Sequence, residues 1–214
     1  ENVEVEAIEL LEIDVLSGSA SVGNVSVGGS VSLVNVDQNI DARVGGMVQA
    51  GLETQDGDLL VTALFEEDIE GESYAGAAGG IVGLGVQVVN LNDSSNVVAR
   101  LAEDADIEQA DAIRVLADAD QTLDAQSIGG AIAQCAAGVA LAYAKMEGSV
   151  EAYADNDSFV GQDGGKYVDR LVLQAKSDAN ITANSIAVSA GIVAAGAGAD
   201  ANATAKHDVT AYID

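Results

Sequence analysis

The chain has 214 residues and a formal charge of −27, because 35 acidic side chains outnumber 8 Lys and Arg. It has no Pro or Trp and 24 Gly, yet 49% of it is apolar, so its core must be built from small aliphatic side chains. The lack of a basic stripe excludes nucleic-acid binding and adsorption to anionic membranes, and the single Cys135 excludes a disulfide scaffold.

The expected elements are β-strands along the whole chain. Apolar residues alternate with small or polar ones from Val25 to Leu33, and again over 59–63, 113–117 and 186–192. Period two with β-branched residues predicts half-buried strands. The absence of Pro agrees with a backbone whose N–H groups are used in ladders.

One stretch admits a different interpretation. Residues 127–144 carry no charge and just reach the length of a membrane-spanning helix. The stretch consists mostly of Gly and Ala and contains the polar Gln134, and no basic residues flank it, so no membrane insertion is expected. A helix over 128–146 remains the alternative to a strand, although Gly costs about 1 kcal/mol at each helical position.

Three features recur four times in one order, which indicates repeats. The first motif occupies 39–44, 96–101, 149–154 and 208–213, and its shared Ala residues are 57, 53 and 59 positions apart. The second is assigned to 13–17, 59–63, 113–117 and 171–175; small-residue stretches fill 21–36, 77–91, 128–144 and 186–201. The sequence therefore predicts an all-β chain, a β-solenoid or elongated stacked β-sheet. It forms one domain (1–214) of about four units with boundaries near 17, 63, 117 and 175.

The spacing also predicts self-assembly. Each first-motif Ala precedes the next second-motif anchor by 21, 18 or 23 residues, and joining Asp214 to Glu1 of another copy gives 20. We expect a head-to-tail homopolymer in which Glu1–Glu12 of one copy continues the sheet at Asp208–Asp214 of the next, because open sheet edges pair unless capped. The expected subunit-seam residues are Val3, Val5, Ile8, Val209, Tyr212 and Ile213. A piece excised from a longer repetitive chain is the alternative.

Three motifs in succession carry a resemblance: V-x-V-G-G-S-V-x-L-x-N-V (25–36), N-I-D-A-R-V (39–44) and G-D-L-L-V-T-A (57–63). Together they resemble large repetitive exoproteins of microbial surfaces, namely leukotoxin-like filamentous adhesins and haemagglutinin-type passengers. The final D-V-T-A-Y-I-D (208–214) is also typical of their repeats. The resemblance implies a secreted or cell-surface β-rich protein with structural or adhesive roles and no enzyme activity. By composition alone, the chain is similar to archaeal sheath or surface-layer proteins.

The residue types that usually carry catalysis are scarce. His207 is expected on the surface beside a turn, and Cys135 as a buried small hydrophobe, with an intermolecular disulfide as its alternative. No Gly-x-Ser-x-Gly elbow with a usable His, Walker or Rossmann signature occurs in its required context. No catalytic residue and no cofactor are therefore expected. A carbohydrate-active enzyme would need bases gathered with acids, and the eight bases are scattered.

The acids and the glycosylation sequons give two further expectations. The runs 66–68, 103–106 and 118–120 are expected to be solvated faces. Structural calcium at the turns 92–96 or 155–158 is the alternative, although no calcium-binding repeat or EF-hand loop is present. Asn-x-Ser/Thr sequons predict glycosylation, with the two in predicted turns named first: Asn92, Asn156, Asn24, Asn180 and Asn202.

The expected function is therefore an extracellular structural protein that self-assembles head-to-tail into a filament, sheath or surface layer. Its expected partner is a second copy of itself, with no nucleic acid involved. The alternative is an adhesin passenger segment that binds a host or neighbour-cell ligand.

Overall fold

The structure, a computed structural model, describes residues 2–52, 55–161 and 167–214. Within these residues all regular structure is β, and no helix occurs. The predicted all-β fold, a β-solenoid or elongated stacked β-sheet, is confirmed. The strands are β1 (Val3–Val36), β2 (Asn39–Gln49), β3 (Gly51–Leu52), β4 (Gln55–Asp56), β5 (Leu59–Asp93), β6 (Asn96–Ala154), β7 (Phe159–Val160) and β8 (Val168–Ile213).

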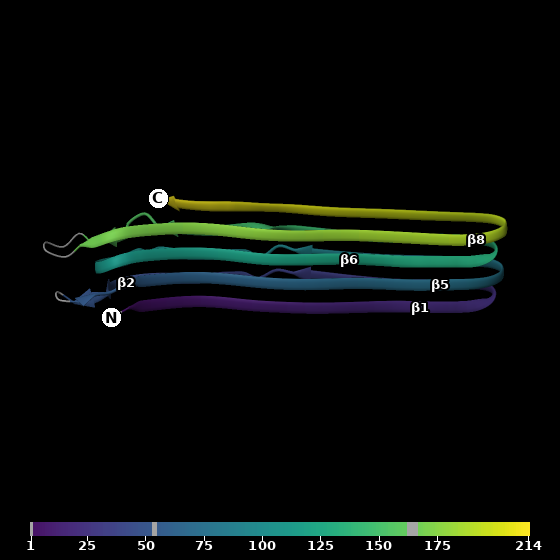
Figure 1. Cartoon of the computed structure of the whole chain (residues 1–214), viewed down its shortest axis with the longest axis horizontal. Helices are drawn as coiled ribbons and strands as arrows, with labels where there is room; N and C mark the ends of the chain where they lie inside the picture. The colour runs from purple at the N-terminus through teal and green to yellow at the C-terminus, as the bar shows by residue number, and fades with distance from the viewer. Residues whose placement is uncertain (1, 53–54, 162–166) are drawn as a thin grey trace.

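The chain winds into four flat coils that stack through parallel pairing (Figure 1). Each coil runs out along one strand, reverses at a narrow tip and returns beside itself. Coil 1 spans 3–49, coil 2 spans 59–109, coil 3 spans 113–160 and coil 4 spans 168–213. We call the end opposite the tip the loop end; β3 and β4 pair antiparallel there.

Equivalent residues of successive coils form columns along the solenoid axis. One column joins Val3, Leu59, Ile113 and Leu171. The first motif follows the expected columns, since Ala42 pairs with Ala99 and Ala152 with Ala211.

The assignment of 13–17 to the second motif is wrong, because Ala63 pairs with Ala7 rather than with Ser17. The segment of coil 1 equivalent to 59–63 is therefore 3–7. The segment 3–7 alternates apolar residues with Glu, and 13–17 begins in the same way with Ile13, Asp14 and Val15. A period-two pattern alone does not distinguish registers that differ by an even number of residues.

The stretch 128–146 lies within β6 and is not a helix. Its Gly and Ala residues pair with β5 on one side and β8 on the other. Among the described residues, no helix has the length and apolar character that crossing a membrane requires.

The core becomes thinner from the loop end to the tip. Near the loop end it holds large side chains such as Phe65, Leu59 and Ile113, all fully buried. A middle cluster is centred on Ile69, Leu91 and Met146. At the tip the buried cluster contains only alanines: Ala77, Ala131, Ala133 and Ala136.

A glycine column explains how thin the tip can be. Gly28, Gly85 and Gly138 face the backbone of the opposite strands, where a Cβ atom would lie 2.6–2.9 Å from a carbonyl oxygen. Real side chains essentially never make such a contact, so Gly permits the two layers to approach this closely.

Candidate assembly edges

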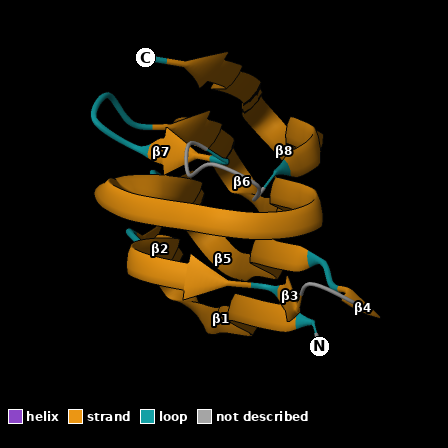
Figure 2. Cartoon of the chain, turned by 90° about the vertical axis from the view of Figure 1, so that its left-hand side faces the viewer, coloured by secondary structure: helices purple, strands orange, loops and turns teal. Residues whose placement is uncertain are grey.

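The two ends of the solenoid are open sheet edges. Among the described residues, β1 pairs only with β5, β2 only with β6 and β8 only with β6. One end therefore exposes the outer edges of β1 and β2, and the other exposes the outer edge of β8 (Figure 2). The expected seam residues all lie on these edges: Val3, Val5 and Ile8 in β1, and Val209, Tyr212 and Ile213 in β8. Unpaired edges of 34, 11 and 46 residues are templates for another chain.

The expected pairing of Glu1–Glu12 with Asp208–Asp214 of another copy stays a prediction, but it does not follow the register found within the chain. Glu1 lies outside the described residues, and residues 3–12 belong to the columns of 171–180. The columns of 208–213 contain 39–44 instead. The reason is that 3–12 lie on an outgoing strand, whereas 208–213 lie on a returning one.

One outward column links charge and aromatic rings across all four coils. Arg100 donates from Nη1 to the Tyr153 hydroxyl at 3.0 Å and from Nη2 to Asp41 Oδ2 at 2.9 Å. The Tyr153 ring stacks on Tyr212, with centroids 5.0 Å apart and planes 9° from parallel. Arg43 pairs with Arg100 and begins this column in coil 1. Tyr212 ends it in coil 4, where no described coil covers it.

The edges differ in charge. The described part of coil 1 has seven acids and one base, Arg43, whereas 168–214 has five acids and three bases. Those bases are Arg170, Lys176 and Lys206. Lys206 lies next to Glu147 in the strand register, and the register places Asp37 of coil 1 in the same column. Among the described residues, the positive side chains are thus richest at the end of the solenoid opposite the acidic coil 1.

A buried polar cluster lies between the loop-end and middle cores. The Gln121 amide donates from Nε2 to Glu67 Oε2 at 2.9 Å and to Asp93 Oδ2 at 2.8 Å, and Ser95 Oγ donates to Asp93 Oδ1 at 2.5 Å. Burial, followed by repulsion from Asp93, raises the pKa of Glu67 to about 7. Burial also raises the pKa of Asp93. The expectation that 66–68 form a solvated face is therefore wrong for Glu67, which is 2% exposed; Glu66 and Asp68 are exposed.

His207 points into the solenoid, so its expected surface position is also wrong. Its Nδ1 lies 2.7 Å from Ser177 Oγ, and burial lowers the pKa of the imidazole. Asp93 lies near enough to influence that pKa, but its two oxygens accept from Ser95 and Gln121. His207 Nδ1 lies against Ser177 Oγ and its Nε2 has no hydrogen-bond partner, so the His–Asp hydrogen bond of a Ser–His–Asp triad is not made.

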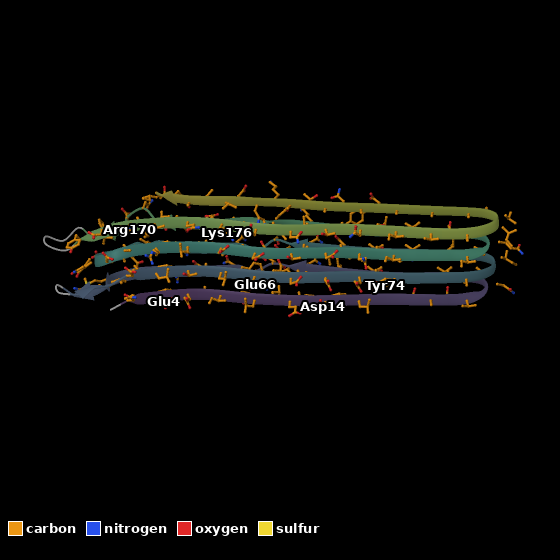
Figure 3. The ribbon with its side chains drawn as sticks, in the orientation of Figure 1. Glu4, Asp14, Glu66, Tyr74, Arg170 and Lys176 are labelled. Carbon is orange, nitrogen blue, oxygen red and sulfur yellow. The ribbon has the colours of Figure 1, made fainter. Side chains whose placement is uncertain are left out.

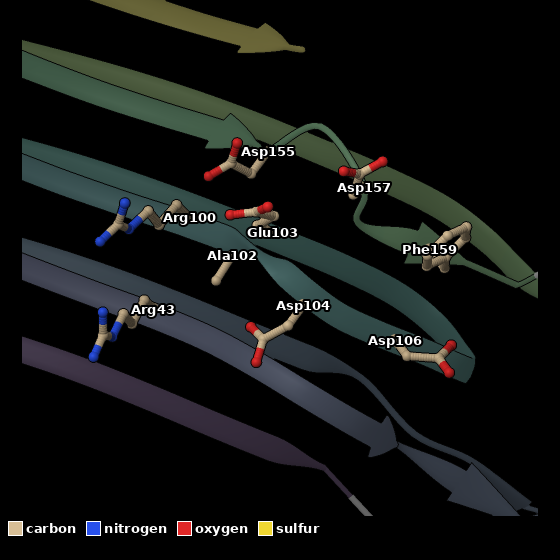
Figure 4. Close-up of a pocket in the computed structure, with 9 residues that line it drawn as sticks. All are labelled: Arg43, Arg100, Ala102, Glu103, Asp104, Asp106, Asp155, Asp157 and Phe159. Atoms are coloured by element: carbon tan, nitrogen blue, oxygen red, sulfur yellow. The ribbon is translucent and has the colours of Figure 1, made fainter.

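An open acidic groove lies near the loop end (Figure 4). Its lining consists of Arg43, Arg100, Ala102, Glu103, Asp104, Asp106, Asp155, Asp157 and Phe159. Glu103, Asp104 and Asp106 come from coil 2, and Asp155 and Asp157 from coil 3. Nowhere in the described chain do three His, Cys, Asp or Glu side chains gather closely enough to hold a metal ion. At the other expected calcium turn, Asp93 is buried and already accepts hydrogen bonds. Structural calcium thus stays a prediction without a ligand set.

The sequons lie in different settings. Asn156 is exposed in a turn, as expected. Asn92 is not in a turn but inside β5, where its Nδ2 donates to Asn35 Oδ1 at 3.0 Å. Asn24 is exposed at the tip, and Asn180 and Asn202 are exposed on β8. Glycosylation at any of these positions stays a prediction.

Cys135 is free and half-buried, rather than buried as expected. It lies in β6 near the tip, in an outward column between Val82 and Ala194. An intermolecular disulfide through this thiol stays a prediction.

No family model matches the chain, and neither a curated protein nor a solved structure matches it. The resemblance to repetitive surface exoproteins therefore stays a prediction.

Proposed function

We propose that the chain is a structural subunit that polymerises head-to-tail into a filament, sheath or surface layer. The β1–β2 edge of one copy would stack on the β8 edge of another. The observation that carries the proposal is the shared column register. The columns that begin at 3–22, 25–36 and 39–44 end in β8, so most of one end of the solenoid is a template for the other, whereas the columns of Met47 and Val48 end in β7.

Backbone pairing supplies most of the attraction. About half of the amides of an edge strand point away from its partner, and each hydrogen bond made there adds about 0.5–1.5 kcal/mol. The inward side chains of the two ends also match. Val3 and Val5 would cover Leu171 and Leu173, which are only partly buried in a single copy.

Side chains outside the core select the register. Tyr212 would receive Arg43 of the next copy, as Tyr153 receives Arg100 within the chain. A guanidinium above a ring is attracted by about 0.5–1 kcal/mol at an exposed site. Asp37 of one copy would lie beside Lys206 of the other, so two side chains of opposite charge would meet across the contact.

Inside the contact, the same stacking would complete the polar cluster. Gln38 belongs to the column of Ser95, Gly148 and His207, and Glu9 to the column of Ser177. Both would come from the covering copy. The Nε2 atom of His207 is buried without a hydrogen-bond partner in a single copy, and Gln38 offers it one.

The extracellular setting rests on the motif resemblance alone, and the proposal assigns the chain no catalysis. The alternative, an adhesin segment that binds a ligand, requires no contact between copies. The two functions therefore differ in whether the purified chain polymerises.

The test is negative-stain electron microscopy of the full chain and of two variants at one position. Ile8 is an exposed edge residue. The Val3 N–H donates to the Asp58 carbonyl oxygen and so points toward coil 2. Successive amides of a strand point to opposite sides, so the Ile8 amide, five residues later, points to the open edge. Ile8→Pro removes that amide without removing a hydrogen bond within the chain. Ile8→Thr keeps the amide and is the matched control.

We expect filaments from the unchanged chain and from Ile8→Thr, and shortened or absent filaments from Ile8→Pro, with unchanged circular dichroism in all three. Isolated short solenoids from the unchanged chain would overturn the proposal and favour the adhesin segment. Equal filaments from Ile8→Pro would overturn the edge-to-edge contact.

A further inference from the structure

The tip carries no charge on either face. Residues 17–36, 73–92, 127–144 and 179–199 contain no Asp, Glu, Lys or Arg, and the register superposes them at one end of the slab. Figure 3 shows the labelled charged residues away from the tip, with Tyr74 the labelled residue nearest to it. A chain with a charge of −27 thus has one end without a charged side chain.

Many of the side chains exposed at the tip are large and aliphatic, and the exposed polar ones there, such as Asn24, are uncharged. Val22 is 88% exposed, Ile192 90% and Ile132 65%. Val27, Ile81 and Val193 are exposed beside them. Chain reversals usually carry polar residues and Gly, so a contiguous apolar end indicates an interaction surface.

The outgoing strands of the tip form a ridge beside a groove. The groove floor is formed by Gly76 and Gly130 of the middle coils, which contribute no side chain, with Ala20 and Val188 of the same column at its two ends. Val22 and Ile132 border it on the tip side. Two residues away in the other direction, the column Gly18, Tyr74, Ile128 and Ile186 projects from the same face as a ridge.

A ridge next to a groove is self-complementary. A twofold axis parallel to the solenoid axis, passing between the two columns, places the ridge of each copy in the groove of the other. The same rotation points the two charged ends in opposite directions. Copies of equal charge therefore meet where no charge is present, and their strong repulsion elsewhere is reduced by distance.

We propose that the outgoing face of the tip binds the same face of a second copy, so that two filaments associate laterally along their tips. The extent of the surface explains why filaments, rather than single copies, would pair. Four coils at about 4.8 Å and seven residues at about 3.3 Å give about 450 Å² per copy, or about 900 Å² per pair. Stable dimers bury about 1,200–2,000 Å², so one copy falls short and a stack of copies does not. The pairing of whole filaments therefore rests on the proposed head-to-tail function.

A lipid bilayer is the less favoured occupant of the tip. Open sheet edges cannot enter hydrocarbon without leaving backbone groups unpaired, and β1 and β8 continue into the tip with such edges. No Lys or Arg lies within the tip ranges to meet lipid phosphate groups.

The experiment uses two glycines on opposite faces of the tip, Gly76 in coil 2 and Gly198 in coil 4. A Cβ at Gly76 or at Gly198 would meet no atom within 4 Å, and neither residue has a positive φ. Val at either position therefore fits the strand, which Val favours. Gly76→Val fills the groove of the outgoing face, whereas Gly198→Val adds the same atoms to the returning face and is the matched control. Mass per length, measured by scanning transmission electron microscopy, reports pairing.

We expect the unchanged chain and Gly198→Val to form filaments with twice the mass per length of those formed by Gly76→Val. Single filaments from the unchanged chain would overturn lateral pairing and leave head-to-tail growth intact. An absence of all filaments would overturn the proposed function itself. Loss of pairing with Gly198→Val, but not with Gly76→Val, would overturn the choice of face. Flotation of the unchanged chain with phosphatidylcholine vesicles, lost with Gly76→Val, would overturn the second copy as occupant in favour of a lipid surface.

Discussion

The loop-end half and the tip share one backbone ladder but distribute their side chains in opposite ways. In the loop-end half, Phe65, Leu59 and Ile113 are inside and acids such as Glu66 and Asp68 are outside. At the tip, small side chains (Gly, Ala and Ser) and Gln87 are inside, and many Val, Ile and Leu are outside. Because stability scales with buried apolar area, the loop-end half is expected to stabilise the fold. The tip keeps its apolar area exposed, where it is available for association.

The largest expected effect on stability comes from a substitution in the loop-end core. Phe65 is fully buried and is the largest of the buried side chains. Phe65→Ala should lower the free energy of unfolding by about 3–5 kcal/mol, because it removes buried area and leaves a cavity. Urea denaturation, carried out at protein concentrations too low for filaments to form, would measure the loss. Val27→Ala at the tip, where Val27 is 62% exposed, should change it by less than about 0.5 kcal/mol. Similar losses from both variants would contradict the comparison.

The polar cluster makes the interior of the loop-end half sensitive to pH. Since the folded pKa of Glu67 is raised to about 7, the folded chain retains a proton that the unfolded chain releases near pH 4.5. The favourable effect of that retained proton is complete below the unfolded pKa, and it is lost as pH rises from about 4.5 through 7. Glu67→Gln should therefore match the unchanged chain near pH 4.5 and be more stable by about 3 kcal/mol at pH 8.

Neighbouring groups determine how this pH dependence must be measured. Asp93 also has a raised pKa and adds to the loss of stability with rising pH. His207 has a lowered pKa, so it acts in the opposite direction and increases stability as pH rises towards its unfolded pKa. The informative quantity is thus the difference between Glu67→Gln and the unchanged chain at each pH. A constant difference across pH 4.5–8 would show that Glu67 does not titrate in this range.

Substitutions at two glycines of the tip test whether the two layers must lie as close together as they do. At Gly85 a Cβ would lie 2.7 Å from the Gly130 carbonyl oxygen, whereas at Gly76 it would meet nothing within 4 Å. Gly85→Ala should cost about 1–3 kcal/mol by forcing the two layers apart. Gly76→Ala should stabilise by about 0.4–1 kcal/mol by restricting the unfolded chain. Thermal unfolding of both would test this, and equal effects would mean that the layers can separate freely.

Much of this arrangement could be predicted from the sequence. The alternation along 59–63 and 113–117 indicated the strands, and the recurring alanines Ala42, Ala99, Ala152 and Ala211 marked the first-motif columns. The same alternation contained the signal for Glu67. Every second residue from Leu59 faces inward, so Glu67 falls inside despite the acids on either side of it. His207 likewise shares the parity of Val209.

The register of coil 1 could not be predicted in the same way. Residues 3–7 and 13–17 have the same period, and the difference between them appears only when the neighbouring coil is in place. The uncharged stretches were visible in the sequence, but their coincidence at one tip depends on that register. The buried acid pair Glu67 and Asp93 also lies on opposite layers of one coil, and the packing of layers is a property of the fold rather than of local pattern.

The smallest expected effect concerns the outer surface of the loop-end half. Asp41 accepts a hydrogen bond from Arg100 at 2.9 Å, and both side chains are about a quarter to a third exposed. Asp41→Asn should lower the free energy of unfolding by only about 0.2–1 kcal/mol, because water and salt screen the ion pair. The loss should shrink further at 1 M salt, where the screening length is about 3 Å. Because Arg100 also donates to Tyr153, it keeps one partner and stays in place. A loss larger than that caused by Gly85→Ala would mean that surface charge, rather than the closeness of the layers, controls the stability of this solenoid.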